Sequence, residues 1–201
     1  TVSAIQKACK QSNFTIISQH LHNYTEVLAT FRYEMPEIKI IDFGDPAVSA
    51  ERCLTVVKDD PWLLFGGVIA ITNSQEQKAT LMQRKEPNFL FVLTREEFEQ
   101  YIEQIIKILN NHEHFLVNRG MNHPANDCEQ GSFTSETDPF EVMFYANLIS
   151  TYLYNTDRIN EAERSAFQGA MMELLLNAVE HGNCNISYQE KNEWLQQGRD
   201  V

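Results

Sequence analysis

A glutamate and an asparagine stand one helical turn apart in the stretch MMELLLNAVEHGN, residues 171–183. Most of their neighbours are apolar, so Glu173 and Asn177 form a polar strip on a helix built from Met, Leu, Ala and Val. A carboxamide oxygen can ligate Mg²⁺, and a carboxylate beside it can orient or deprotonate an attacking group. The alternative is an exposed pair on a helix that packs by its other side. The spacing alone leaves both interpretations open.

The longer stretch FQGAMMELLLNAVEHGN resembles the N-box of the GHKL-type ATPases. It is most similar to the anti-sigma-factor serine kinases and related histidine-kinase-like ATPase domains, in which Glu, Asn and a closing His-Gly-Asn occur in this order. The resemblance spans residues 132–201. It implies ATP and Mg²⁺ as cofactors, with Glu173 as the catalytic carboxylate and Asn177 as the Mg²⁺ ligand. His181 and Asn183 would then lie near the phosphates.

In those families the Asp that binds adenine and the glycine-rich phosphate lid come later in the domain, whereas this sequence ends at Val201. Without a lid, few backbone N–H groups would remain to bind the triphosphate. We therefore expect either a longer natural protein or a fragment with weak affinity for ATP.

Three polar residues in the first half stand at the ends of apolar runs: Asp42, Thr72 and Thr94. In open α/β sheets, ligands bind at the carboxyl ends of the strands. The segments MPEIKIIDFGDP and VIAIT resemble parts of a response-regulator receiver domain. That resemblance implies Asp42 as the phosphoryl acceptor and Thr72 as the switch residue that hydrogen-bonds a phosphoryl oxygen.

Two departures from the receiver pattern affect this site. Thr94 stands where the family has a Lys, and a neutral hydroxyl cannot replace a cation in holding a dianion. The family's first strand and its Mg²⁺-binding acidic pair would precede Thr1, so we expect missing residues or a replacement strand. The alternative role for Asp42 is a strand-end carboxylate that caps a turn.

Alternating runs in the first half must position these residues. Short apolar runs predict buried parallel strands, and helical periodicity is found between them. The predicted strands are 14–18, 38–43, 67–72 and 89–93, and the predicted helices are 22–33, 47–58, 75–85 and 95–110. This alternation predicts a doubly wound α/β sheet, flavodoxin-like and receiver-like. In the last helix, one apolar stripe is predicted to face the core: Phe98, Ile102, Ile105, Ile106 and Leu109.

The chain divides by pattern into a receiver-like domain (1–111), a linker (112–131) and a partial α+β ATPase domain (132–201). In the last part, Asp138-Pro139 predicts a helix start, and a helix from 161 to 181 is predicted to end with Gly182 in a left-handed conformation. The linker holds the side-chain types of a zinc site: His112, His114, His123 and Cys128. Their spacing matches no established ligand pattern, so we do not expect a metal there.

Composition restricts the partners. The 201-residue chain has a formal net charge of −12, which disfavours nonspecific binding to nucleic acid or anionic lipid. No apolar run approaches the roughly 20 residues of a membrane span, so we expect a cytoplasmic protein without membrane contact. The four cysteines have no CxxC pair and are expected to be reduced thiols.

These patterns favour a bacterial-type signalling protein in which a receiver-like domain regulates an ATP-dependent serine/threonine protein kinase of the anti-sigma-factor type. Its partners would be an antagonist-like protein or an upstream histidine kinase, and a homodimer stays open. The alternative is a non-catalytic, nucleotide-dependent switch that regulates partners by docking. A sensor-type histidine kinase is disfavoured, because no helical hairpin with a phosphoacceptor His precedes the ATPase part.

Overall fold

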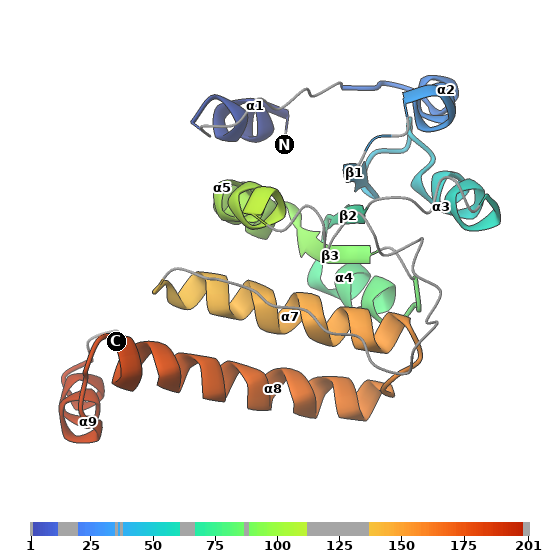
Figure 1. The fold of residues 1–201 in the computed structure, drawn as a ribbon. Helices are drawn as coiled ribbons and strands as arrows, with labels where there is room; N and C mark the ends of the chain where they lie inside the picture. Colours follow the sequence, from blue (N-terminus) through green and yellow to red (C-terminus); the bar gives the residue numbers. More distant parts are fainter. Residues whose placement is uncertain are drawn as a thin grey trace.

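The computed structural model describes residues 2–11, 20–34, 36, 38–60, 67–86, 89–111 and 137–198 (Figure 1). The helices of this part are α1 (Val2–Gln11), α2 (Tyr24–Glu34), α3 (Ala50–Asp59), α4 (Gln75–Met82), α5 (Arg95–Asn111), α7 (Pro139–Asn155), α8 (Glu161–Asn177) and α9 (Tyr188–Gln196). The strands are β1 (Ile38–Asp42), β2 (Gly67–Thr72) and β3 (Phe89–Thr94).

The three strands form one parallel sheet in the order β1-β2-β3. Every residue of β2 and β3 is buried, as expected for apolar runs without polar alternation. β1 alternates between buried and more exposed positions, and Ile40 is 36% exposed. The predicted strands 38–43, 67–72 and 89–93 are confirmed to within one residue. The predicted strand 14–18 lies outside the described residues.

Helices cover both faces of this sheet. On one face, α1, α5 and α7 pack on strand residues that include Ile69, Ile71 and Phe91. On the other face, α2, α3 and α4 pack on strand residues that include Ile41 and Val68. Alternate residues of β2 therefore contribute to two separate cores, because neighbouring side chains of a strand point to opposite faces. The mixed α/β class with a parallel sheet agrees with the prediction.

Glycine is required where β2 begins. A Cβ atom on Gly67 would lie 2.1 Å from Cδ1 of Leu90, which is fully buried on β3. Beside this point the pairing of β2 with β3 is irregular, between Val68 and Ile69. The absent side chain at Gly67 thus makes room for a core leucine of the adjacent strand.

The predicted apolar stripe of α5 faces the core. Phe98, Ile102 and Ile105 are buried, and Ile106 and Leu109 are partly buried against the same cluster. Acidic residues occupy the first turn of this helix, where the helix dipole favours negative charge. α5 therefore packs by one stripe and exposes its charged side, as the 3.6-residue period predicts.

α7 and α8 form an antiparallel helical hairpin, and α8 lies outside α7, away from the strands (Figure 1). Asp138 caps α7 as predicted, accepting a hydrogen bond from the Phe140 N–H at 2.9 Å. Phe144 and Leu148 of α7 are buried in the core that α5 and β3 also form. The linker 112–131 lies outside the described residues, so the predicted domain boundary stays a prediction.

The expected end of the α8 helix is wrong in its details. α-Helical structure stops at Asn177, and the chain continues as a π-helical turn, Ala178–Asn183. Gly182 does not take a positive φ; Asn185 does so instead, with φ 54°. In the wider turn, the Cys184 N–H donates to the Val179 carbonyl at 2.9 Å, so a terminal carbonyl is satisfied without a left-handed glycine.

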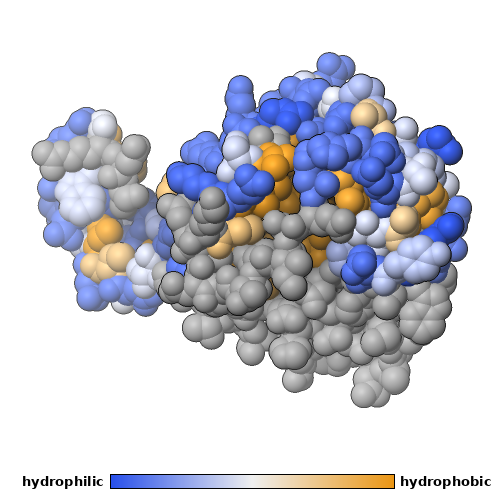
Figure 2. All heavy atoms as spheres, turned by 90° about the horizontal axis from the view of Figure 1, so that it is seen from above, coloured by the Kyte–Doolittle hydropathy of each residue, from blue (hydrophilic) through white to orange (hydrophobic). Residues whose placement is uncertain are grey.

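The end of α8 and α9 carry exposed apolar side chains. Leu174, Tyr188 and Leu195 are 70%, 71% and 56% exposed. Viewed from above, this end of the molecule projects from the rest and shows apolar surface among hydrophilic side chains (Figure 2). Within the described ranges, no helix has both the length and the apolar character needed to cross a bilayer.

Candidate functional site

Asp42 is the last residue of β1, at the carboxyl edge of the sheet. Its Oδ1 accepts a hydrogen bond from the Gly44 N–H at 2.9 Å, and its side chain is 22% exposed. A Cβ atom on Gly44 would lie 2.2 Å from the side chain of Asn73, so glycine allows Asn73 to approach this turn. The carboxylate is thus held by a turn and still reached by solvent.

A cation reaches Asp42 from α5, the helix that follows β3. Nη2 of Arg95, the first residue of α5, lies 2.9 Å from Oδ2 and 3.1 Å from Oδ1 of Asp42. The same nitrogen lies 3.1 Å from Oδ1 of Asn73, which follows β2. Because parallel strands end at one edge of the sheet, three chain segments meet around a single guanidinium. The Arg95 side chain is 40% exposed, so solvent and salt screen this ion pair.

Thr72 lies at the same edge, but its hydroxyl points into the protein. It donates to the carbonyl of Leu93 at 3.1 Å and lies 3.3 Å from the carbonyl of Ser74. The residue is fully buried at the end of β2. In this conformation Thr72 ties β2 to β3, and its expected switch role stays a prediction.

Thr94, the residue found in place of the family's Lys, caps α5. Its hydroxyl accepts from the Glu97 N–H at 3.3 Å, and its own N–H donates to Glu97 Oε2 at 2.8 Å. This reciprocal pair is a capping box. Burial raises the pKa of Glu97, but hydrogen bonds from Lys78, the Thr94 N–H and Gln75 outweigh it and leave the pKa below its ordinary value. Thr94 thus serves helix initiation, while the charge comes from Arg95.

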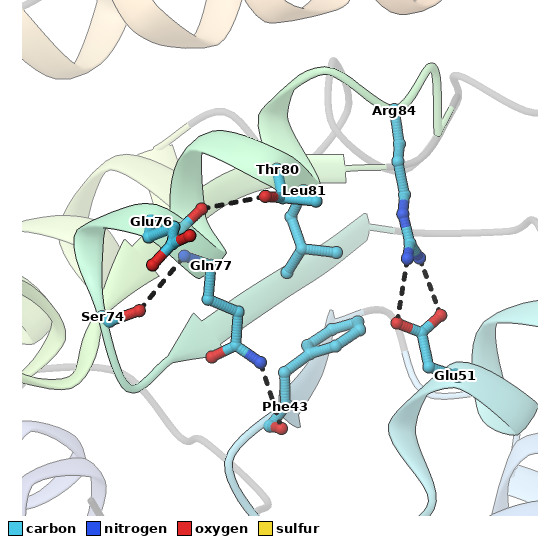
Figure 3. Close-up of a pocket in the computed structure, with 8 residues that line it drawn as sticks. All are labelled: Phe43, Glu51, Ser74, Glu76, Gln77, Thr80, Leu81 and Arg84. Carbon is cyan, nitrogen blue, oxygen red and sulfur yellow. Dashed lines mark hydrogen bonds and ion pairs between the residues drawn. The ribbon is translucent and has the colours of Figure 1, made fainter.

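A hollow of about 410 Å³ opens beside Asp42, between α3 and α4 (Figure 3). Phe43, the residue after Asp42, points its ring toward Leu81. Nε2 of Gln77 lies 3.5 Å from the Phe43 carbonyl oxygen. Arg84 and Glu51 form a two-bond ion pair, at 2.7 and 3.0 Å, that joins the end of α4 to α3. Both polar and apolar side chains therefore line the hollow, which lies next to the turn that holds Asp42.

The second predicted site lies at the far end of α8. Nδ2 of Asn177 donates to Oε1 of Glu173 at 3.2 Å, so the two side chains share one edge of the helix as their spacing predicts. Glu173 is exposed and Asn177 is half-buried. Neither residue lines the hollow beside Asp42. Their expected roles toward Mg·ATP stay predictions.

His181 and Asn183 contact protein groups. Nδ1 of His181 donates to the carbonyl of Ile186, and its ring stacks on Tyr188 with centroids 5.5 Å apart. Nδ2 of Asn183 donates to the Thr137 hydroxyl oxygen at 3.1 Å. The π-helical turn is thereby fixed to α9 and to the residues before α7. Proximity of either side chain to ATP phosphates stays a prediction.

A metal centre is not found in the part of the chain that the structure describes. There, no three His, Cys, Asp or Glu side chains are grouped to hold a metal ion. The histidines and the cysteine of the linker, His112, His114, His123 and Cys128, lie outside this part. The described cysteines at positions 53 and 184 are free thiols.

Comparison with models of known families, with curated proteins and with solved structures finds no match. The resemblance to receiver domains and to GHKL-type ATPases thus rests on the residues quoted above. Any functional inference must therefore be argued from the geometry around Asp42 and around Glu173.

The sequence interpretation missed Arg95 and Asn73. Both directly follow residues that it selected, Thr94 and Thr72. The available signal was their position, since residues just past the ends of parallel strands share one edge of the sheet. A long side chain such as that of Arg95 can reach an acidic group two strands away. Arg95 was therefore a candidate for the cation that Thr94 cannot supply.

Proposed function

We propose that this protein is a cytoplasmic signal-transduction protein in which a receiver-like α/β unit carries Asp42 as a phosphoryl acceptor. In this proposal the unit is coupled to a histidine-kinase-like ATPase segment. The supporting observation is the Arg95 guanidinium 2.9 Å from Asp42 Oδ2. A phosphoryl dianion on Asp42 needs a nearby cation, and Arg95 supplies one where Thr94 cannot.

Phosphorylation of Asp42 would proceed by attack of a carboxylate oxygen on the phosphorus of a donor, such as the phosphohistidine of an upstream kinase. A new P–O bond forms while the bond from phosphorus to the leaving group breaks, and the leaving group keeps the electron pair. Arg95 would move its hydrogen bonds from the carboxylate to the phosphoryl oxygens. Among the described residues, no three His, Cys, Asp or Glu side chains are grouped to hold a metal ion.

The ATPase segment would use the Glu173–Asn177 edge. Because Nδ2 of Asn177 donates to Glu173, its carboxamide oxygen is the atom that would ligate Mg²⁺. ATP, when bound, supplies the phosphoryl group for transfer. Glu173, which is exposed, would orient or deprotonate the Ser or Thr hydroxyl of a protein partner resembling an anti-sigma-factor antagonist.

A second candidate function is a docking switch without phosphoryl transfer. It is favoured by the fact that both oxygens of Asp42 already have partners, Gly44 and Arg95. In this case, the ion pair with Arg95 would replace phosphorylation as the determinant of the active conformation. Tight nucleotide binding without transfer of label from ATP to candidate partners would favour this candidate over the kinase.

The acceptor role is tested with ³²P-labelled acetyl phosphate and Mg²⁺ on the purified protein. We expect label that hydroxylamine removes in the wild type and none in Asp42→Asn. Arg95→Ala should lower incorporation by about tenfold or more, since hydrogen bonds to charged groups contribute about 1.5–3 kcal/mol. Arg95→Lys should retain part of it.

Arg32→Ala is the matched control, because Arg32 is an exposed arginine of α2 that does not line the hollow beside Asp42. Its incorporation should equal that of the wild type. Equal labelling of Asp42→Asn and the wild type would refute the acceptor role.

A further inference from the structure

α4 touches the Asp42 site with its first turn. Nε2 of Gln77 lies 3.5 Å from the carbonyl oxygen of Phe43, the neighbour of Asp42. Nζ of Lys78 lies 2.7 Å from Oε2 of Glu97, which caps α5 just after Arg95. A change in the Asp42–Arg95 pair can therefore reach the start of this helix through Phe43 and Glu97.

The other end of α4 is held by the helical hairpin. Nη1 of Arg164, on α8, donates to the Met82 carbonyl at 2.7 Å. The hydroxyl of Tyr154, on α7, donates to the Gln83 carbonyl at 3.0 Å. The guanidinium of Arg164 also lies over the ring of Tyr154, 4.5 Å from its centroid. Two helices thus bind the last carbonyls of a third.

Arg164 is the one buried residue of α8, a helix described in full, and it is 8% exposed. Its charge meets a helix C-terminus, where unpaired carbonyls carry negative partial charge. The face of an aromatic ring adds further cation stabilisation. Burying an arginine costs free energy unless such contacts are made. The packing position of α8 therefore depends on the position of the end of α4.

We propose that Arg164 is a positioning residue that couples the Asp42 site to α8 through α4. The eight residues of α4 span about 12 Å, so Phe43 and Glu97, which adjoin the Asp42–Arg95 pair, contact one end of a rigid helix and Arg164 contacts the other. α8 continues from Arg164 to Glu173 and Asn177. The purpose of the coupling, control of the ATPase edge, rests on the proposed function, whereas the coupling itself does not.

Non-additivity between distant variants measures this coupling. Variants more than about 7–10 Å apart normally add to within about twofold in an equilibrium constant. A communicating element gives effects of about fivefold or more. Amide hydrogen exchange of residues 165–177 is compared in the wild type, Arg95→Ala, Arg164→Met and the double variant.

We expect Arg95→Ala to change these exchange rates by about fivefold or more in the otherwise wild-type protein. In the Arg164→Met background the change should fall below about twofold. Arg164→Lys, which retains the charge, should restore part of the effect, which a residue with a merely structural role would not do. An equal change in both backgrounds, or none in either, would overturn the proposal.

Tyr154→Phe provides a milder second background, because it removes one hydroxyl and its hydrogen bond to Gln83 and leaves the ring in place. The effect of Arg95→Ala should be reduced there too, so the comparison stands even if Arg164→Met fails to fold. Arg32→Met, on an exposed arginine of α2, is the matched control and should leave the effect unchanged. The experiment uses no phosphoryl donor, so absent labelling of Asp42 and absent coupling are separate results.

Discussion

Arg95 changes the interpretation of Thr94 at the scale of single residues. The sequence suggested that the receiver-like site had lost its cation, because Thr94 occupies the expected position. In the structure, the next residue brings a guanidinium within 2.9 Å of Asp42. The guanidinium of Arg95 also hydrogen-bonds to two partners at once, Asp42 and Asn73. The site therefore contains an ion pair that the receiver pattern alone does not predict.

Lys39 of β1 gives a prediction about pH. It is 4% exposed, and burial lowers its pKa to about 8. The folded state thus releases this proton at lower pH than the unfolded state, whose lysine titrates near ~10.4. Stability should rise as the pH is raised from about 8 to about 10.4.

Lys39→Met should accordingly raise the free energy of unfolding at pH 7 by about 1–3 kcal/mol. The gain should shrink as the pH approaches about 10, where the native lysine is already neutral. Urea unfolding at both pH values measures this. Lys7→Met is the control, since the Lys7 side chain is 71% exposed and should show little change. A gain independent of pH would argue against buried charge as the cause.

At the scale of elements, the strands and most helices follow from sequence pattern. The apolar runs of β2 and β3 are fully buried, and the stripe of α5 faces the core. The end of α8 did not follow, because a π-helical turn depends on hydrogen bonds that no short pattern specifies. The capping box was available in the sequence as Thr94-Arg-Glu-Glu97 and was missed.

Glu97 gives a prediction for the α5 cap. Its pKa is lowered, so its contribution to stability is present above the unfolded value of about 4.3 and is lost as the pH falls through the folded value. Glu97→Gln should lower the free energy of unfolding at pH 7 by about 1 kcal/mol. The difference from wild type should shrink toward pH 3. Glu96→Gln, an exposed neighbour, should cost much less.

Gly67 gives a prediction for the contact between β2 and β3. Gly67→Ala would bring a methyl group to 2.1 Å from Cδ1 of the buried Leu90. We expect a loss of about 1–3 kcal/mol in the free energy of unfolding. Gly169→Ala in α8 meets no atom within 4 Å and should instead stabilise the protein by about 0.5–1 kcal/mol. Thermal unfolding of the two variants compares them, and a neutral Gly67→Ala would contradict the packing argument.

At the scale of the whole molecule, the packing of α7 is a feature that the sequence pattern did not specify. Phe144 and Leu148 of this helix lie in the core beside α5 and β3. Which apolar faces meet depends on the shapes of all of them, and the period of one helix does not reveal its partner. The buried contact of Arg164 with Met82 is likewise outside the reach of local pattern.

The proposed ATPase edge is tested on the whole protein by Mg·ATP binding. Asn177→Ala removes the proposed Mg²⁺ ligand and should weaken Mg·ATP binding by about tenfold or more, because ligand loss costs binding free energy directly. Asn192→Ala, an exposed asparagine of α9, is the matched control and should bind like the wild type. Isothermal calorimetry measures both. Unchanged affinity in Asn177→Ala would remove the basis for this edge.

The central claim, that Asp42 accepts a phosphoryl group beside Arg95, is tested most directly by locating the modified residue. Borohydride reduces an aspartyl phosphate to homoserine, and peptide mass spectrometry then identifies its position. After treatment with acetyl phosphate, we expect homoserine at position 42 in the wild type and a large reduction in Arg95→Ala. Homoserine at another position, or none at 42 while the folded protein is exposed to the donor, would contradict the claim.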